Sequence, residues 1–386
     1  MLTIRQKRKR KWSEAGRQLR LLYLNTSLGA FQIAGASWVA LLAARGFSLV
    51  EIGFAESVFH VASLLFEVPS GVISDVFGRK RSMVLSQCMT LVSALLMLVS
   101  DSLAGVLPAM VFSAFGYNFA SGTREALAYE TLKAEGREAE YDGYSSTDMM
   151  LYTFFSSLAT LCAGVALALG YRRAYLVDIA LGAVCLMSVL RLREAGCALA
   201  EGEEIRNGGG GTKNGPQNGA WKRIVQCFRE SVHFLLHSRK AMELILLNAA
   251  VGAAATLLRF FLQARLTQNG LPEALLGPAL FFMGLGGAAG ARLILCCKGW
   301  SYGRVFAVSA ITVAGCVAAA LLPVPAVMIA GGFLSALCDN FLQVRSDVRL
   351  NEMVPTGQRA TLISVSSLCF SGVMIVLSPL FGALFS

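Results

Sequence analysis

Long apolar runs alternate with short polar segments along nearly the whole chain. Each run holds roughly the 20 residues that a helix needs to cross the hydrocarbon core of a bilayer. Because a backbone in lipid must satisfy its own N–H and C=O groups, helices are the expected spanning elements. The pattern predicts eleven spanning helices, at residues 19–45, 49–74, 79–100, 103–132, 144–169, 172–192, 241–266, 273–296, 302–321, 323–346 and 359–383.

Composition supports this interpretation and narrows the class of protein. Of the 386 residues, 55% are hydrophobic and only 15% are charged, which indicates an all-α integral membrane protein rather than two soluble domains. The ten cysteines show neither a paired CxxC arrangement nor a zinc-ligand spacing. We therefore expect them to fill small spaces between helices, and we predict no metal site and no cofactor. No nucleophile, base and orienting acid cluster in a polar segment, so we do not expect an enzyme.

The net charge of +10 is interpreted as a signal of orientation rather than of a nucleic-acid partner, since the basic residues lie in short segments between apolar runs. A cluster of six precedes the first predicted helix near the N-terminus, namely Arg5, Lys7, Arg8, Lys9, Arg10 and Lys11. The positive-inside rule then places the N-terminus in the cytoplasm, where this segment can contact anionic lipid. We predict a multi-pass protein of the cytoplasmic (inner) membrane.

A polar segment divides the chain into two unequal halves. Residues 207–219 have the composition of a flexible coil, and residues 221–232 carry apolar positions at the spacing of a helix lying on the membrane surface. We predict a basic cytoplasmic N-terminus at 1–18, a six-helix bundle at 19–192, a cytoplasmic linker with an amphipathic helix at 193–240, and a five-helix bundle at 241–386. An odd number of spans leaves the C-terminus opposite the N-terminus.

Two motifs resemble those of a known family. The turn between the second and third predicted helices carries Gly71, Asp75, Gly78, Arg79 and Arg81. This spacing resembles the signature loop of the major facilitator superfamily, whose members move small solutes across membranes. Residues 121–132, with the sequence SGTREALAYETL, are similar to the SGxxEALxYD pattern of a bacterial group of that superfamily.

The resemblance implies a fold of two pseudo-symmetric helical bundles around a midplane cavity, with the twelfth helix of the usual plan absent from this chain. It also implies that the signature loop latches the bundles together, with Asp75 against the start of the last helix near Gln358 and Arg359, and near an acid of the fourth helix, Glu125 or Glu130. The alternative is a charged turn that merely obeys the positive-inside rule. The corresponding turn at 296–304 lacks the aspartate, so the latch is expected in one half only.

The second predicted helix carries a polar stripe. At 100° per residue, Glu56, His60, Ser63, Glu67, Ser70 and Ser74 fall near one line along the helix. Ionisable groups at membrane depth are costly unless they are paired or face water, and a histidine beside an acid can exchange protons near neutral pH. Glu56, His60 and Glu67 are therefore candidates for proton coupling. The alternative is a satisfied polar contact between packed helices, and Glu67 also belongs to the family's structural pattern.

Isolated polar residues on other helices are candidates for the substrate cavity: Asn118, Asp178, Asn248, Arg259 and Asp339. Arg259 is the strongest of them, because a charge at this depth usually faces a central cavity. The alternative is that the Arg259 side chain extends to the nearby membrane–water interface. Asn118 stands where many members of the family have an arginine.

From these features we predict a secondary active transporter that works by alternating access. It contains no GxxxxGK[ST] phosphate loop, so a proton gradient is the expected energy source. The leading hypothesis is proton-coupled efflux of an amphipathic or drug-like compound by a monomer in the lipid bilayer. The alternatives are uptake or facilitated diffusion of a small metabolite, and a receptor or assembly partner that no longer transports, which the missing twelfth helix suggests.

Overall fold

The computed structural model describes residues 14–194, 239–297, 299–353 and 359–386. Within these ranges every regular element is a helix, as the sequence predicted. The first half contains α2 (Glu14–Ala30), α3 (Ile33–Ala36), α4 (Trp38–Ala44), α5 (Leu49–Phe77), α6 (Arg79–Val99), α7 (Leu103–Ala120), α8 (Thr123–Ala134), the 3-10 helix η1 (Glu138–Glu140), α9 (Tyr141–Leu161), α10 (Ala163–Leu169) and α11 (Tyr171–Leu190). The second half contains α14 (Arg239–Gln268), α15 (Glu273–Leu293), α16 (Tyr302–Ala319), α17 (Pro325–Met353) and α18 (Arg359–Phe385).

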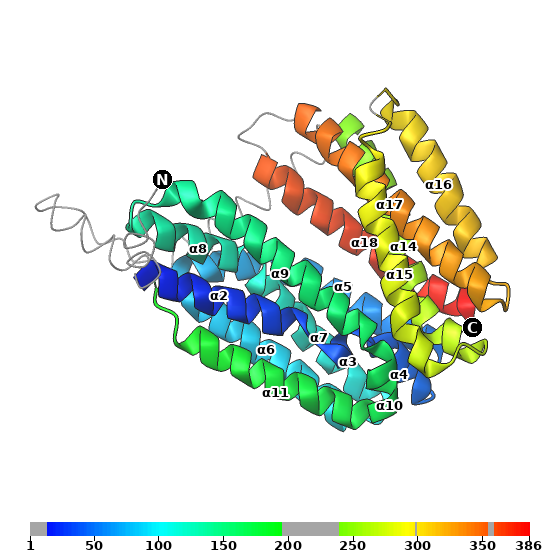
Figure 1. The fold of residues 1–386 in the computed structure, drawn as a ribbon, viewed down its shortest axis with the longest axis horizontal. Coiled ribbons are helices and arrows are strands. Elements are labelled where there is room, and N and C mark those ends of the chain that lie inside the picture. Colours follow the sequence, from blue (N-terminus) through cyan, green and yellow to red (C-terminus); the bar gives the residue numbers. More distant parts are fainter. Residues whose placement is uncertain (1–13, 195–238, 298, 354–358) are drawn as a thin grey trace, which may run out of the picture.

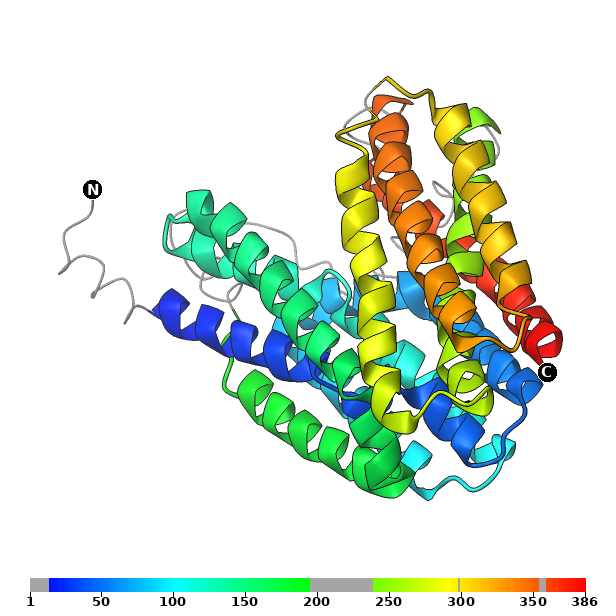
Figure 2. The ribbon, with the colours of Figure 1, turned by 45° about the vertical axis from the view of Figure 1, so that its right-hand side comes forward.

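The helices form two bundles that diverge like the arms of a V. Figures 1 and 2 show α2–α11 in one arm and α14–α18 in the other. We call the end where the arms meet the closed end; it contains residues 44–49, 161–171, 268–273 and 385. The opposite end, with residues 77–79, 134–141, 190–194 and 293–302, is called the open end.

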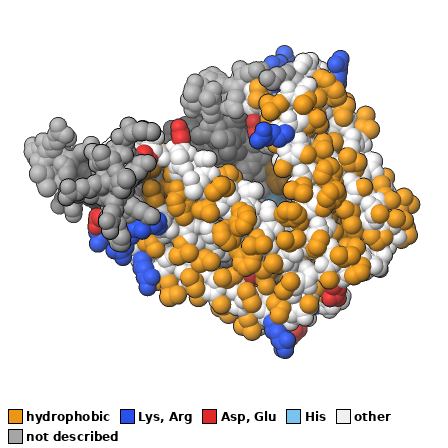
Figure 3. Space-filling view, in the orientation of Figure 1, with side chains coloured by type: hydrophobic (Ala, Val, Ile, Leu, Met, Phe, Trp, Pro, Cys, Tyr) orange, Lys and Arg blue, Asp and Glu red, His pale blue; other side chains and the backbone are white. Residues whose placement is uncertain are grey.

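The surface of the molecule is that of a membrane protein. Figure 3 shows hydrophobic side chains spread over both bundles, with charged side chains gathered towards their ends. Several large apolar side chains on different helices are more than half exposed, among them Leu65, Val99 and Ile311. Such exposure is expected for side chains that face lipid instead of water.

Small residues bring the two bundles together at the closed end. A Cβ added at Gly53 of α5 would overlap the carbonyl oxygen of Ser378 of α18, and one at Gly382 would overlap that of Leu49. The same holds for Gly277 of α15 and the carbonyl of Leu161. Without side chains at these glycines, the backbones of the two halves can approach closely, as is common between membrane helices.

The largest hydrophobic core lies at this closed end and is shared between the bundles. It combines Leu42 and Ile52 from the first half with Leu257, Phe261 and Phe385 from the second. The smaller clusters towards the open end belong to a single bundle each. Apolar burial therefore seals one end of the molecule and leaves the other end divided.

Three predicted helices are not continuous, so those predictions are wrong in detail. Residues 19–45 break at 31–32 and at Ser37, residues 103–132 break at Ser121–Gly122, and residues 144–169 bend by 48° at Cys162. Gly122 adopts a positive φ of 69°, a left-handed conformation that favours glycine. The break near residue 31 has a polar cause in the cavity and is described below.

The remaining predicted spans coincide with helices to within a few residues. Among the described residues, nine helices are long and apolar enough to cross a membrane, and the bent pair α9 and α10 makes ten if it counts as one span. The first predicted span, residues 19–45, is not among them, because it is broken into shorter helices. Most of the predicted linker, with its amphipathic helix, lies outside the described residues, as do Gln358 and most of the basic N-terminus.

The close approach at Gly277 generates a stability prediction. Gly277→Ala places a Cβ against the carbonyl of Leu161, and overpacking of this kind costs about 1–3 kcal/mol. We expect a lower midpoint of thermal unfolding in detergent, followed by intrinsic fluorescence. Gly284→Ala, on the same helix where an added Cβ meets nothing within 4 Å, should unfold at or above the wild-type temperature. Equal midpoints for the two variants would show that the contact is not close.

Candidate functional site

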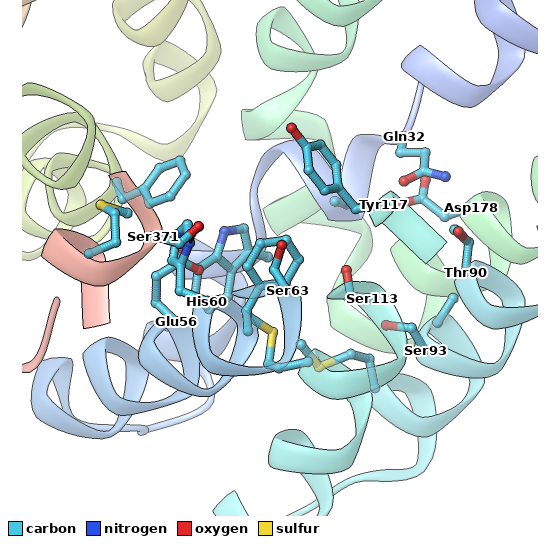
Figure 4. A pocket seen from close by; sticks show the side chains of 18 of the residues that line it. Gln32, Glu56, His60, Ser63, Thr90, Ser93, Ser113, Tyr117, Asp178 and Ser371 are labelled. Atoms are coloured by element: carbon cyan, nitrogen blue, oxygen red, sulfur yellow. Dashed lines mark hydrogen bonds and ion pairs between the residues drawn. The ribbon is translucent and has the colours of Figure 1, made fainter. Parts of the chain in front are cut away.

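A cavity of about 460 Å³ lies between the two bundles. The first half contributes residues from α3 to α7 and from α11, and the second half contributes residues from α14 and α18. The walls combine hydroxyl groups with aromatic rings and a few titratable groups, as Figure 4 shows. The polar lining includes Gln32, Glu56, His60, Ser63, Thr90, Ser93, Ser113, Asp178, Thr256, Ser367 and Ser371. The aromatic lining is Trp38, Phe59, Tyr117, Tyr175, Phe260 and Phe370.

Glu56 and His60 form a buried pair on one side of this cavity. Nε2 of His60 lies 3.3 Å from Oε1 of Glu56, one helical turn away on α5. The other ring nitrogen, Nδ1, lies 3.3 Å from Oγ of Ser371 on α18. Both ring nitrogens of His60 are therefore engaged, one within the first bundle and one across to the second.

Asp178 lies on the opposite side of the cavity, where the first predicted helix breaks (Figure 4). The break leaves backbone N–H groups without helical acceptors, and Gln32 at the N-cap provides no side-chain bond. The carboxylate of Asp178 on α11 accepts them instead, at 2.8 Å from the N–H of Ile33 and 2.9 Å from that of Gly35. Because unpaired N–H groups are costly in a membrane interior, this carboxylate allows the chain to change direction beside the cavity.

Polar contacts join α5 to α18 along the wall of the cavity. Oγ of Ser57 donates to the carbonyl of Ile375 at 2.8 Å, and Oγ of Ser367 donates to Oε2 of Glu67 at 3.2 Å. The His60–Ser371 contact lies between them. All three predicted proton-coupling residues therefore lie at or beside the boundary between the bundles.

Ser63, another member of the predicted stripe, lines the cavity and is also hydrogen-bonded within the first bundle. Oγ of Ser63 donates to Oδ1 of Asn118 at 2.8 Å, and the amide nitrogen of Asn118 donates to the carbonyl of Ser63 at 2.8 Å. Asn118 is buried and is not among the residues that line the cavity. Its amide joins α5 to α7, so the structure gives this cavity candidate a place in helix packing.

The remaining cavity candidates lie in the second bundle. Arg259 pairs with Asp339, whose carboxylate oxygen is 3.8 Å from Nη2, and Arg259 is not among the cavity-lining residues. Asn248 accepts a hydrogen bond from the hydroxyl of Tyr302 at 2.9 Å. Asn248 and Asp339 line a second pocket of about 390 Å³, which shares Thr256, Ser367 and Phe370 with the central cavity.

The signature segment contains one break, at Gly78, where φ is 99°. Arg79 opens α6 and contacts Glu130 of α8, with Nε 3.4 Å from Oε1. Of the two predicted acids, Glu130 thus contacts the loop, whereas no such contact of Glu125 is observed among the described residues. The side chain of Asp75 lies outside what the structure describes.

The two other predicted loop residues show no close contact of the kind expected for a latch. An added Cβ at Gly71 would meet nothing within 4 Å, and Arg81 is exposed. The sequence also gave no indication of Glu194, whose carboxylate accepts the N–H of Lys80 at 3.1 Å and so caps α6. This acid connects the end of the first bundle to the signature segment.

The second bundle contributes two serines that contact the α5 stripe and that were not predicted from the sequence. Ser367 and Ser371 are four residues apart on α18 and thus share one face. Their spacing could have been recognised as a polar stripe matching that of α5. The local sequence does not identify Gln32 as the site of a break, because the break depends on Asp178, which is distant in the chain.

The chain is similar in sequence to known membrane transporters. Residues 21–379 match the model of the Major Facilitator Superfamily. A 96-residue stretch is 31% identical to the uncharacterized MFS-type transporter YxaM of Bacillus subtilis (strain 168), covering 25% of this chain and 24% of that protein.

Solved structures share the fold at low sequence identity. A mutant of the nucleoside transporter NupG superposes with a TM-score of 0.72 at 14% identity, covering 95% of this chain and 90% of that one. A POT family transporter in complex with 5-aminolevulinic acid gives 0.66 at 12% identity, with 95% and 90% covered. A D-xylose-proton symporter gives 0.60 at 13% identity, with 96% and 88% covered.

The Asp178 contact leads to a second prediction. Asp178→Ala removes the acceptor of two buried N–H groups, and each buried donor left unpaired costs about 1–3 kcal/mol. The midpoint of thermal unfolding should fall in the alanine variant and fall less in Asp178→Asn, whose amide oxygen can still accept. An alanine variant as stable as the wild type would mean that the carboxylate does not hold the break.

Proposed function

The chain belongs to the Major Facilitator Superfamily, and we propose that it carries a small solute through the central cavity by proton-coupled alternating access. Membership of this family makes it a multi-pass membrane transporter rather than an enzyme. Coupling to protons is supported chiefly by the position of His60 between the two bundles.

Protonation of His60 would change a contact between the moving parts. A neutral imidazole has one donor and one acceptor nitrogen, whereas the protonated ring donates from both. The protonated ring can therefore donate to Glu56 and Ser371 at once, and its charge is balanced by the carboxylate 3.3 Å away. The neutral ring keeps both contacts only by donating to Glu56 and accepting from the Ser371 hydroxyl. Protonation therefore reverses the direction of the hydrogen bond to α18 and gives the ring a charge, so the strength of the contact between α5 and α18 depends on the proton.

The shape supports one state of an alternating-access cycle. The bundles are packed together at the closed end, and the second pocket extends the cavity along α14, α17 and α18 towards the open end. If the two bundles rocked about the cavity, they would separate at the closed end and come together at the open end. Basic residues gather near the open end, including Arg79, Lys80 and Lys133. By the positive-inside rule this end is cytoplasmic, so the state is inward-facing.

We propose export as the direction. A solute that binds the Glu56 carboxylate competes with the protonated ring of His60 for the same partner, and competition for one partner produces exchange. With a proton gradient directed inward, exchange drives the solute outward. Uptake with a proton is the second candidate, favoured by the fold shared with a D-xylose-proton symporter.

A transport experiment tests the coupling. In liposomes loaded with a solute chosen by a thermal-shift screen, His60→Asn should retain solute exchange at equal pH but lose acceleration by an imposed pH gradient. The reason is that asparagine preserves polar contacts across the interface without carrying a proton. Flux and luminal pH are followed together.

The control variant changes a residue at the same contact between α5 and α18 that carries no titratable group. Ser57→Ala removes a contact between α5 and α18 and should keep its response to the gradient, whatever its rate. Full gradient dependence in His60→Asn would exclude His60 as the coupling group and leave the stripe as a packing feature.

A further inference from the structure

We propose that the central cavity selects small aromatic monocations, such as amines or quaternary ammonium compounds carrying one or two rings. This inference rests on the proposed function, because it takes the cavity to be the transport site. It names the chemical class of the solute, which the fold alone does not determine.

The charges of the wall favour a cation. Glu56 and Asp178 are both buried, at 7% and 5% exposure, and none of the described residues lining the cavity is lysine or arginine. The donors to Asp178 are backbone N–H groups, which leave its negative charge in place. Glu56 faces His60, whose charge is present only when the ring is protonated.

The same walls disfavour anions and zwitterions. A carboxylate or phosphate entering the cavity would lose its hydration without gaining a cationic partner, and desolvating an unpaired ion is costly. In the second bundle, Nη2 of Arg259 lies 3.8 Å from the carboxylate of Asp339, which balances its charge. Arg259 is also absent from the residues that line the central cavity.

The arrangement of acids allows a cation to approach from more than one side. In Figure 4, Glu56 lies on one side of the cavity with His60 and Ser371, and Asp178 lies on the other, with Tyr117 between them. A monocation near the centre would therefore experience two buried negative groups. In surroundings of low dielectric constant, such interactions extend further than in water.

The aromatic rings supply the second element of selectivity. Trp38 of α4 and Phe260 of α14 meet edge to face with centroids 6.1 Å apart, and Phe59 and Tyr117 lie 6.2 Å apart. Ring faces attract organic cations and stack with aromatic solutes. Since Trp38 and Phe260 come from different bundles, a ring bound between the halves could contact both.

The volume limits the size of the solute. A cavity of about 460 Å³ falls in the lower part of the range of roughly 300–1,000 Å³ that holds small-molecule ligands. One or two rings with a small ammonium group fit this space. A neutral polyol could use the serine and threonine hydroxyls, but it would leave the two carboxylates without a charged partner.

A binding experiment with matched headgroups tests the class. The purified protein, in a non-ionic detergent, binds tritiated benzyltrimethylammonium, a permanent cation with one ring and no proton to lose. Unlabelled benzyltrimethylammonium, benzyl alcohol and phenylmethanesulfonate then compete for the site; they share a benzyl group and carry one positive charge, none and one negative charge. We expect the ammonium compound to displace the probe at a concentration at least about tenfold lower than the other two.

Charge-neutral variants locate the effect. Asp178→Asn and Glu56→Gln should each weaken binding of the labelled benzyltrimethylammonium about tenfold while leaving the affinity for benzyl alcohol within about twofold. Asparagine and glutamine keep an acceptor oxygen, and the unfolding midpoint of each variant confirms that it is folded. Glu138→Gln removes one negative charge from the exposed η1 turn, outside the cavity, and should bind the probe as the wild type does.

The outcomes separate this inference from the proposed function. Equal or stronger competition by the alcohol or the sulfonate, or no competition by any of the three, would overturn the cation class. Flux is measured separately in liposomes with benzyltrimethylammonium. Selective binding without flux would support the class of ligand and contradict the transport function.

Discussion

The contact between α5 and α18 is the constraint on which the rest of the structure depends. At the closed end Gly53 and Gly382 let the two backbones touch, and in the middle the contact becomes polar through His60 and Glu67. The same helices therefore join the bundles, form a wall of the cavity and carry titratable groups. A change of protonation there acts directly on the surface along which the bundles must separate.

The magnitudes are consistent with coupling by a few polar contacts. A neutral hydrogen bond contributes about 1 kcal/mol and a charged one about 1.5–3 kcal/mol, so protonating His60 changes the interface by an amount typical of allosteric coupling, which is about 1–3 kcal/mol. Reversing a strongly biased two-state equilibrium needs about 5.5 kcal/mol. A proton at one histidine therefore biases the cycle, and the solute bound in the cavity supplies the remaining difference.

Much of the fold could be predicted from the sequence because the bilayer imposes it. Apolar run length gave the spans, and the stripe on α5 gave Glu56, His60 and Glu67, which lie at the bundle boundary. The break near Gln32 could not be predicted, because it depends on Asp178, a residue about 145 positions away in sequence. The residue types of Arg259 and Asn118 suggested a cavity, but in the folded chain Arg259 lies 3.8 Å from the carboxylate of Asp339 and Asn118 is hydrogen-bonded to Ser63.

Pulsed electron–electron distance measurements between the bundles test the central claim most directly. Genetically encoded spin labels are needed because the chain has ten cysteines. One pair is placed at the exposed positions Lys133 and Val348 of the open end, and the other at Arg173 and Val324, which are exposed near the closed end. Between pH 6 and 8, a range around the usual titration of histidine, the account predicts opposite shifts of the two distances that are lost in His60→Asn. The same pH-dependent shifts in that variant, or unchanged distances in the wild type, would contradict it.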